Sequence, residues 1–175
     1  MSRRLHIGGH ARTPGWEVLD ANPGPSVDHV GNAADLSRFG ENSFEQIYAS
    51  HVLEHFAYLR RLVPALIEWR RVLSPAGTLC VSVPDLDVLA GLFVDRDRLT
   101  VEERFLVMRM MFGGQSDDYD YHLAGLNEEF LTSYLTAAGF TGIRRVENFG
   151  LFDDTSLLEL KGTPISLNMI AVKAA

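Results

Sequence analysis

The short run from Ser50 to His55 brings two imidazoles and a carboxylate together. On a helical turn, His51, Glu54 and His55 occupy positions i, i+3 and i+4, which share one face. Imidazole and carboxylate groups are common zinc ligands, and the residue order matches the H-x-x-E-H signature of one class of zinc proteases. The run can therefore hold a divalent metal, and a zinc metalloprotease is one candidate function.

A protease of that class needs more than this run supplies. Its motif lies inside a long helix and has a further acidic ligand downstream, whereas here a buried strand, Ile47 to Ala49, leads directly into the motif. The structural alternative is that Val52 and Phe56 anchor a turn in the core while Glu54 and His55 face the solvent. We therefore assign no metal ligand from the sequence.

A parallel β-α-β unit positions this run. After it, apolar residues recur at helical spacing from Leu59 to Leu73, interrupted by Pro64, and a second buried strand covers Thr78 to Val83. Ligands of open parallel sheets bind at the carboxyl ends of the strands. Ser50 and His51 follow such an end, so we expect a binding site there.

The rest of the chain continues this alternation. The sequence predicts further strands at 5–7, 16–19, 27–30, 143–149 and 166–172, and further helices at 86–94, 100–112 and 127–139. We expect the last two strands to form an antiparallel hairpin at one edge, joined by a non-helical connection. The pattern indicates an open, mostly parallel sheet covered on both faces.

Composition excludes several function classes. The 175 residues fit a single domain over 1–175, and a net charge of −7 disfavours a nucleic-acid partner. No apolar run is long enough for a membrane span, and no signal-peptide pattern is visible. With Cys80 as the lone cysteine, no internal disulfide is possible. We expect a cytoplasmic protein without a membrane partner and leave its oligomeric state open.

Two turns near the N-terminus are candidates for a nucleoside-containing ligand. The pair Gly8-Gly9 permits a sharp bend and close approach of a ligand to the backbone, although the full G-x-G-x-x-G pattern is absent. Asp20 ends the second strand, where a carboxylate can accept hydrogen bonds from a ribose, or simply cap a turn. Its spacing from Gly8 is too short for a dinucleotide site, which leaves other adenosine cofactors. Asp35-Leu36 offers an acceptor beside an apolar wall.

A later loop carries another histidine. Tyr119 to His122 lies between the glycine pair Gly113-Gly114 and the helix-capping residue Asn127. Aromatic rings and an imidazole in such a loop suit a substrate lid with a general base, and the alternative is an ordinary surface loop.

Taken together, these segments resemble the class I S-adenosylmethionine-dependent methyltransferases, in particular a compact, mostly bacterial subgroup of predicted small-molecule enzymes. The resemblance covers Leu5 to Lys173. The matching segments are Leu5–Gly9, Gly15–Asp20, Asp35-Leu36, Asn42–His55, Trp69–Gly77, Val83–Asp87 and Phe112–Gln115.

The resemblance implies a Rossmann-like three-layer α/β sandwich, a seven-stranded, mostly parallel sheet with an antiparallel last strand, and S-adenosylmethionine as cofactor. Gly8 and Gly9 would pass beside its methionine part, and Asp20 would hold the ribose. Asp35 and Leu36 would meet the adenine, and Ser50 and His51 would lie near the sulfonium. His10 stands where the family has a second glycine and would border the cofactor.

The implied function is methyl transfer to an oxygen or nitrogen of a small molecule, with His122 and His51 as candidate bases. In some related O-methyltransferases a Glu-x-x-Glu-His segment binds a metal, but only Glu54 and His55 match it here. A side chain at His10 can crowd the cofactor, so a non-catalytic cofactor-binding or regulatory domain of the same fold is the alternative.

Overall fold

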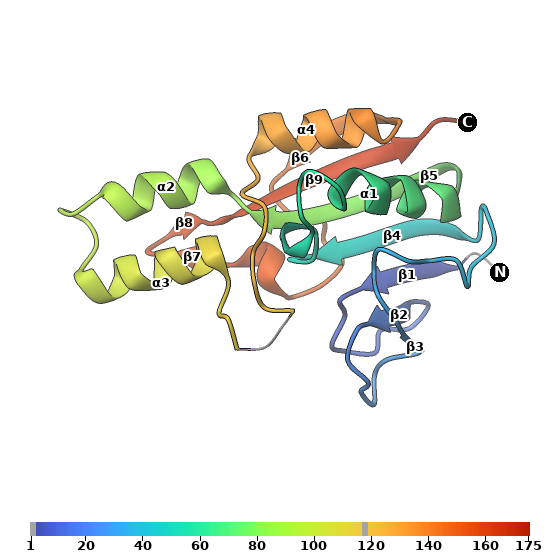
Figure 1. Cartoon of the computed structure of the whole chain (residues 1–175), viewed down its shortest axis with the longest axis horizontal. Helices are drawn as coiled ribbons and strands as arrows, with labels where there is room; N and C mark the ends of the chain where they lie inside the picture. The colour runs from blue at the N-terminus through green and yellow to red at the C-terminus, as the bar shows by residue number, and fades with distance from the viewer. Residues whose placement is uncertain (1–2, 117–118) are drawn as a thin grey trace.

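A seven-stranded sheet organises the computed structural model, which describes residues 3–116 and 119–175 (Figure 1). The strand order is β3-β2-β1-β4-β5-β9-β6, and β9 runs antiparallel to both of its neighbours. The predicted mostly parallel α/β sheet with an antiparallel last strand is confirmed. The strands are β1 Arg4–Ile7, β2 Glu17–Asp20, β3 His29–Val30, β4 Phe44–Ser50, β5 Leu73–Pro84, β6 Phe140–Val146 and β9 Ser166–Lys173.

The end of the chain differs in detail from the predicted hairpin. β6 and β9 do pair antiparallel, but β9 lies inside the sheet and β6 forms the edge. β6 begins at Phe140, earlier than predicted. A bulge at Gly142, which has a φ of 59°, interrupts the regular alternation of inward and outward side chains by which a strand is recognised in a sequence. The connection between β6 and β9 holds a 3₁₀ turn, η2 (Thr155–Leu157), and a small hairpin formed by β7 (Glu159–Leu160) and β8 (Thr163–Pro164), rather than irregular chain alone.

Three of the four α-helices of the described residues begin directly after a capping side chain. Helix α2 (Leu86–Val94) follows the Asp85 cap, α3 (Val101–Phe112) the Thr100 capping box, and α4 (Glu128–Ala137) the Asn127 cap. Helix α1 (Leu62–Val72) contains Pro64 in its first turn, where the missing N–H has no helical acceptor to lose. Pro64 therefore marks a helix start rather than a kink.

The two faces of the sheet are covered differently. Ile47 and Ala49 of β4 face the main core, to which α1 contributes Trp69. Tyr48, between them, points to the opposite face, where it packs with Trp16 and Cys80 against residues 149–152. In the parts of the chain that the structure describes, this second cluster includes no α-helical residue. Helices were expected on both faces, but the connections among the first four strands are too short and turn-rich to form them.

Helices α2 and α3 lie side by side beyond the carboxyl ends of β4 and β5 (Figure 1). They share a smaller core with Ile165, to which they contribute Leu89, Leu92 and Val107. Within residues 3–116 and 119–175, no helix combines the length and apolar character that crossing a bilayer requires.

Candidate active site

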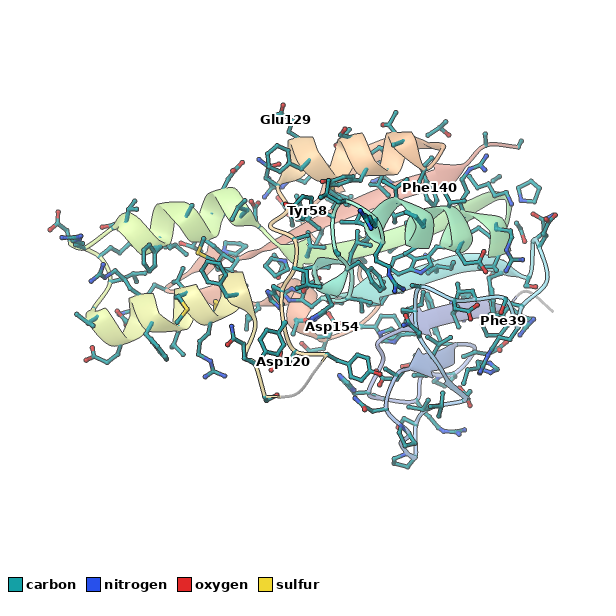
Figure 2. All side chains as sticks on the ribbon, viewed as in Figure 1. Phe39, Tyr58, Asp120, Glu129, Phe140 and Asp154 are labelled. Atoms are coloured by element: carbon teal, nitrogen blue, oxygen red, sulfur yellow. The ribbon has the colours of Figure 1, made fainter. Side chains whose placement is uncertain are left out.

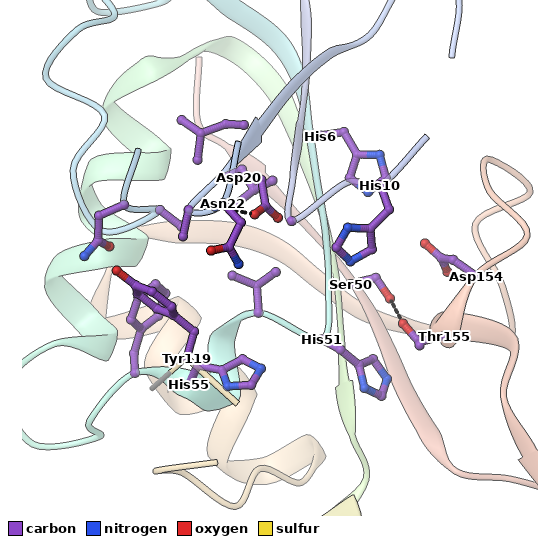
Figure 3. A pocket seen from close by; sticks show the side chains of 18 of the residues that line it. His6, His10, Asp20, Asn22, Ser50, His51, His55, Tyr119, Asp154 and Thr155 are labelled. Atoms are coloured by element: carbon purple, nitrogen blue, oxygen red, sulfur yellow. Dashed lines mark hydrogen bonds between the residues drawn. The ribbon is translucent and has the colours of Figure 1, made fainter. Parts of the chain in front are cut away.

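A cavity of about 1220 Å³ opens at the carboxyl ends of β1, β2 and β4 (Figure 3). Its wall includes five of the residues that the sequence predicts for the site: Gly8, His10, Asp20, Ser50 and His51. Two segments distant in sequence also contribute to the wall, residues 119–121 with Leu123, and residues 151–155. Figure 2 shows one residue of each, Asp120 on the loop after α3 and Asp154 near the end of β4.

The turn after β1 depends on glycine. Gly8 has a φ of +75°, and a Cβ at this position would lie 2.6 Å from Cγ2 of Val52. Gly9 does not line the main cavity but borders a smaller one beside it, and a Cβ there would lie 2.8 Å from the His6 ring. Because Gly8 has no side chain, a ligand in the cavity can approach the backbone of this turn closely.

The His10 side chain is exposed and belongs to the cavity wall, in the company of His6 and Ser50 (Figure 3). His10 therefore lies where its side chain was expected to crowd the cofactor. The cavity nevertheless has a volume of about 1220 Å³ with the imidazole in place.

Asp20 is held in a fixed orientation at the end of β2. One carboxylate oxygen, Oδ1, accepts a hydrogen bond from the backbone N–H of Asn22 at 2.7 Å. This local turn aims the carboxylate at the cavity, as Figure 3 shows. Within residues 3–116 and 119–175, Oδ2 accepts no hydrogen bond, which leaves it to a ligand with hydroxyl donors.

Asp35 and Leu36 lie away from the cavity. Leu36 is fully buried in the main core, and Asp35 accepts a hydrogen bond from the backbone of Ser37 at 3.0 Å. The preceding residues, Asn32 to Ala34, line the cavity instead. Two hydrogen bonds hold this segment: the Ala34 N–H donates to the Asn32 side chain, and the indole N–H of Trp69 donates to the Ala33 carbonyl. The run of small residues after β3 was the sequence signal for this wall.

Ser50 and His51 leave β4 at the centre of the site. Ser50 Oγ lies 2.9 Å from Oγ1 of Thr155, which fixes the η2 segment against the strand. His51 has a φ of 53°, and its Nε2 lies 2.9 Å from Oγ of Ser166. Burial lowers the pKa of His51 to about 4, so its imidazole is neutral at neutral pH.

His122 does not line the cavity, although its neighbours Tyr121 and Leu123 do. Its side chain is 11% exposed, its Nε2 lies 3.9 Å from Oε1 of Glu54, and its ring meets that of His55 edge-on at 4.9 Å. Burial lowers the pKa of His122. The predicted lid loop also spans residues 117 and 118, which lie outside the described residues.

Glu54 is buried, contrary to the expectation that it faces the solvent. It sits in the 3₁₀ turn η1 (Leu53–His55), and its side chain is 1% exposed. The segment after His122 covers it, since the backbone N–H groups of Leu123 and Ala124 donate to the Glu54 carbonyl at 2.8 and 3.1 Å. Sequence reasoning missed this burial because the covering segment is distant in the chain. Desolvation raises the pKa of Glu54 to about 8.

His55 completes this group and does line the cavity. Its Nδ1 lies 3.1 Å from the carbonyl oxygen of Tyr121, which can only accept, so Nδ1 carries the proton and Nε2 keeps its lone pair. The H-x-x-E-H segment is thus a single 3₁₀ turn of three residues, without the long helix of a metalloprotease. That function is set aside.

Comparison with known proteins gives one sequence match. A family model described as a methyltransferase domain matches residues 17–81, which run from β2 into β5. No curated protein matches the chain.

Solved structures share the fold at low sequence identity. The chain is similar to a possible exported protein from Bordetella parapertussis (TM-score 0.62, 14% identity), covering 99% of this chain and 63% of that one. It also resembles the CurJ carbon methyltransferase (TM-score 0.56, 19% identity), covering 99% of this chain and 49% of that one. A third similar structure is an S-adenosylmethionine-dependent methyltransferase from Archaeoglobus fulgidus (TM-score 0.61, 15% identity), covering 98% of this chain and 86% of that one. The chain therefore spans about two thirds or half of the length of the first two.

Proposed function

We propose that the chain is a class I S-adenosylmethionine-dependent methyltransferase, which transfers the methyl group of this cofactor to an oxygen or nitrogen of a small molecule; the methyltransferase-domain match over residues 17–81 and the fold shared with solved methyltransferases support the proposal. One observation carries the proposal. The cavity opens beside β1 and β4, where the strand order reverses, and ligands of open α/β sheets bind at that switch point.

The residues around the cavity suit this cofactor. Gly8 exposes backbone where the methionine part would lie, and the free oxygen of Asp20 would accept from the ribose hydroxyls. Asn32 and Ala33 would meet the adenine, in place of Asp35 and Leu36. Cavities of about 300–1,000 Å³ hold drug-sized ligands, so about 1220 Å³ accommodates a cofactor and a small acceptor together.

When bound, the cofactor supplies an electrophilic methyl group on its sulfonium, and the protein contributes orientation and proton transfer. His51 is the better placed of the two candidate bases, since it lines the cavity and His122 does not. His122 would act from behind the wall, by positioning Glu54 and His55.

A non-catalytic cofactor-binding domain is the second candidate function, and the His10 side chain at the cavity favours it. The two functions differ in turnover but share cofactor binding. His10→Gly should bind S-adenosylhomocysteine at least as well as the parent, and a large loss of affinity would show that His10 is a contact rather than an obstacle.

Titration calorimetry with S-adenosylmethionine and S-adenosylhomocysteine tests the proposal. Both should bind one site per chain, and Asp20→Ala should weaken binding about 10- to 100-fold, as expected for the loss of hydrogen bonds to a charged group. The matched control is Asp97→Ala, an exposed carboxylate that is not part of the cavity wall. Absence of binding by the folded parent would refute the proposal, and an unaffected Asp20→Ala variant would refute the ribose assignment.

A further inference from the structure

Three potential metal ligands converge behind the cavity wall. Glu54, His55 and His122 each offer one ligand atom, and these atoms lie within 4.8 Å of one another. Two of the residues come from η1 and the third from the loop after α3, so the group arises from tertiary folding. The sequence analysis left His122 out of any metal site because nothing local links it to the other two.

The Glu54 carboxylate is the unusual member of this group. Both of its oxygens are buried, and neither has a hydrogen-bond partner among residues 3–116 and 119–175. Two imidazole nitrogens of the described residues lie near it, Nδ1 of His51 and Nε2 of His122, at 3.5 and 3.9 Å from Oε1. A buried carboxylate without hydrogen bonds is costly, and an ion is one of the ordinary ways to satisfy it.

Hydrogen bonds to neighbouring backbone groups hold the potential metal ligands in position. His55 donates from Nδ1 to the Tyr121 carbonyl, an arrangement that orients an imidazole so that Nε2 can bind a metal. The Glu54 carbonyl is bound by the backbone of Leu123 and Ala124, which ties η1 to the loop that carries His122. These contacts hold all three residues in one place.

We propose that Glu54, His55 and His122 bind a divalent transition-metal ion, best suited to Zn²⁺. Two imidazoles and one carboxylate form a ligand set used by zinc, whereas Mg²⁺ and Ca²⁺ prefer oxygen ligands. Ligand atoms around tetrahedral zinc lie roughly 3.3 Å apart, as follows from bonds of about 2.0–2.1 Å. Side-chain rotation would have to close the present separations by at most about 1.5 Å.

Three protein ligands leave a fourth position open, the arrangement of catalytic zinc sites. Of the three residues only His55 lines the cavity, so the cavity is the side from which a small molecule would reach this position. An oxygen of the methyl acceptor can occupy it, and this part of the inference rests on the proposed function.

The test measures zinc binding directly, on untagged protein first treated with a chelator. Titration of Zn²⁺, followed by calorimetry and by metal content after desalting, should give one equivalent per chain. Co²⁺ in its place should give the visible absorption of a low-coordinate site. Glu54→Gln and His122→Ala should each weaken Zn²⁺ binding by at least about 10-fold, as even outer-shell changes commonly do.

The matched control is His10→Ala, which removes an imidazole from the same cavity but not from the ligand group. It should bind Zn²⁺ as the parent does. Circular dichroism checks folding, and if Glu54→Gln does not fold, His122→Ala decides. Binding of several weak equivalents, or tight binding that neither ligand variant changes, would overturn the metal site.

The two proposals fail separately. Zinc binding without affinity for S-adenosylhomocysteine would support the metal site and refute the methyltransferase proposal. In the opposite case, cofactor binding would persist in a protein that takes up no metal, and the ligand group would be a purely structural cluster. Glu54→Gln should leave cofactor affinity unchanged, because Gly8 follows β1 and Asp20 ends β2, whereas Glu54 belongs to η1.

Discussion

Protonation of His6 should be a main reason why the folded state weakens in mild acid. His6 lies in β1 on the loop-covered face, 7% exposed, with its ring 4.3 Å from that of Phe152 and 4.9 Å from that of Tyr48. Its Nδ1 is buried and has no hydrogen-bond partner in the described part of the chain. Burial among these rings lowers the pKa of His6 from 6.5 to about 4.

The sign of the effect follows from linkage. Between about pH 6.5 and pH 4 the unfolded chain binds a proton at His6 that the folded chain does not, so stability falls as pH falls. At pH 7 the contribution is close to zero. At pH 5 the difference between the two pKa values corresponds to a loss of about 2 kcal/mol.

Urea unfolding of the parent and of His6→Phe, at about pH 7 and about pH 5 with a chelator present, measures this contribution. The phenylalanine variant should lose about 2 kcal/mol less stability between the two pH values than the parent does. His6→Gln, which remains polar but cannot titrate, should show the same flattening and so separates titration from packing. Equal pH dependence in all three proteins would refute the assignment of a low pKa to a buried, neutral His6.

Three further predictions concern the site and the sheet. Gly8→Ala should destabilise the fold by about 1–3 kcal/mol in urea unfolding and weaken S-adenosylhomocysteine binding, because alanine is strained at this φ and meets Val52; a neutral substitution would contradict the observed turn. His51→Ala should reduce turnover about 10²–10⁴-fold in a coupled assay of S-adenosylhomocysteine release, and full activity would exclude it as the base. Glu17→Gln should cost about 1 kcal/mol at neutral pH, since the hydrogen bond from Arg3 lowers the pKa of the partly exposed Glu17 to about 2. That stabilisation should vanish as pH falls from 4.5 towards 2, and acid unfolding curves that coincide for variant and parent would argue against it.

The sequence predicts local features well. Helix α2 spans the predicted residues, and α3 begins at Val101, one residue from the predicted start, because a helix cap is formed by residues within a few positions of one another. The turn at Gly8 and the orientation of Asp20 are likewise local, and both residues line the cavity; their contacts with a cofactor remain predictions.

What the sequence could not predict depends on distant parts of the chain. Glu54 was expected in the solvent because its own segment does not show that Leu123 and Ala124 fold over it. Asp35 and Leu36 were expected at the cavity, but the indole of Trp69 fixes the Ala33 carbonyl and directs Leu36 into the core. His122 belongs with Glu54 for the same reason, because only the tertiary fold brings them together.

The long-range bonds at the end of β4 have a consequence for how the protein acquires its site. Tyr48 binds Asp154, Ser50 meets Thr155, and His51 meets Ser166, over separations of 106, 105 and 115 residues. Closing such long loops is entropically costly and slows folding. During synthesis, the first strands and their glycine turn leave the ribosome well before residues 151–155 exist. The cavity can therefore close only after residues 151–155 have been synthesised, so the first strands alone cannot form the ligand site.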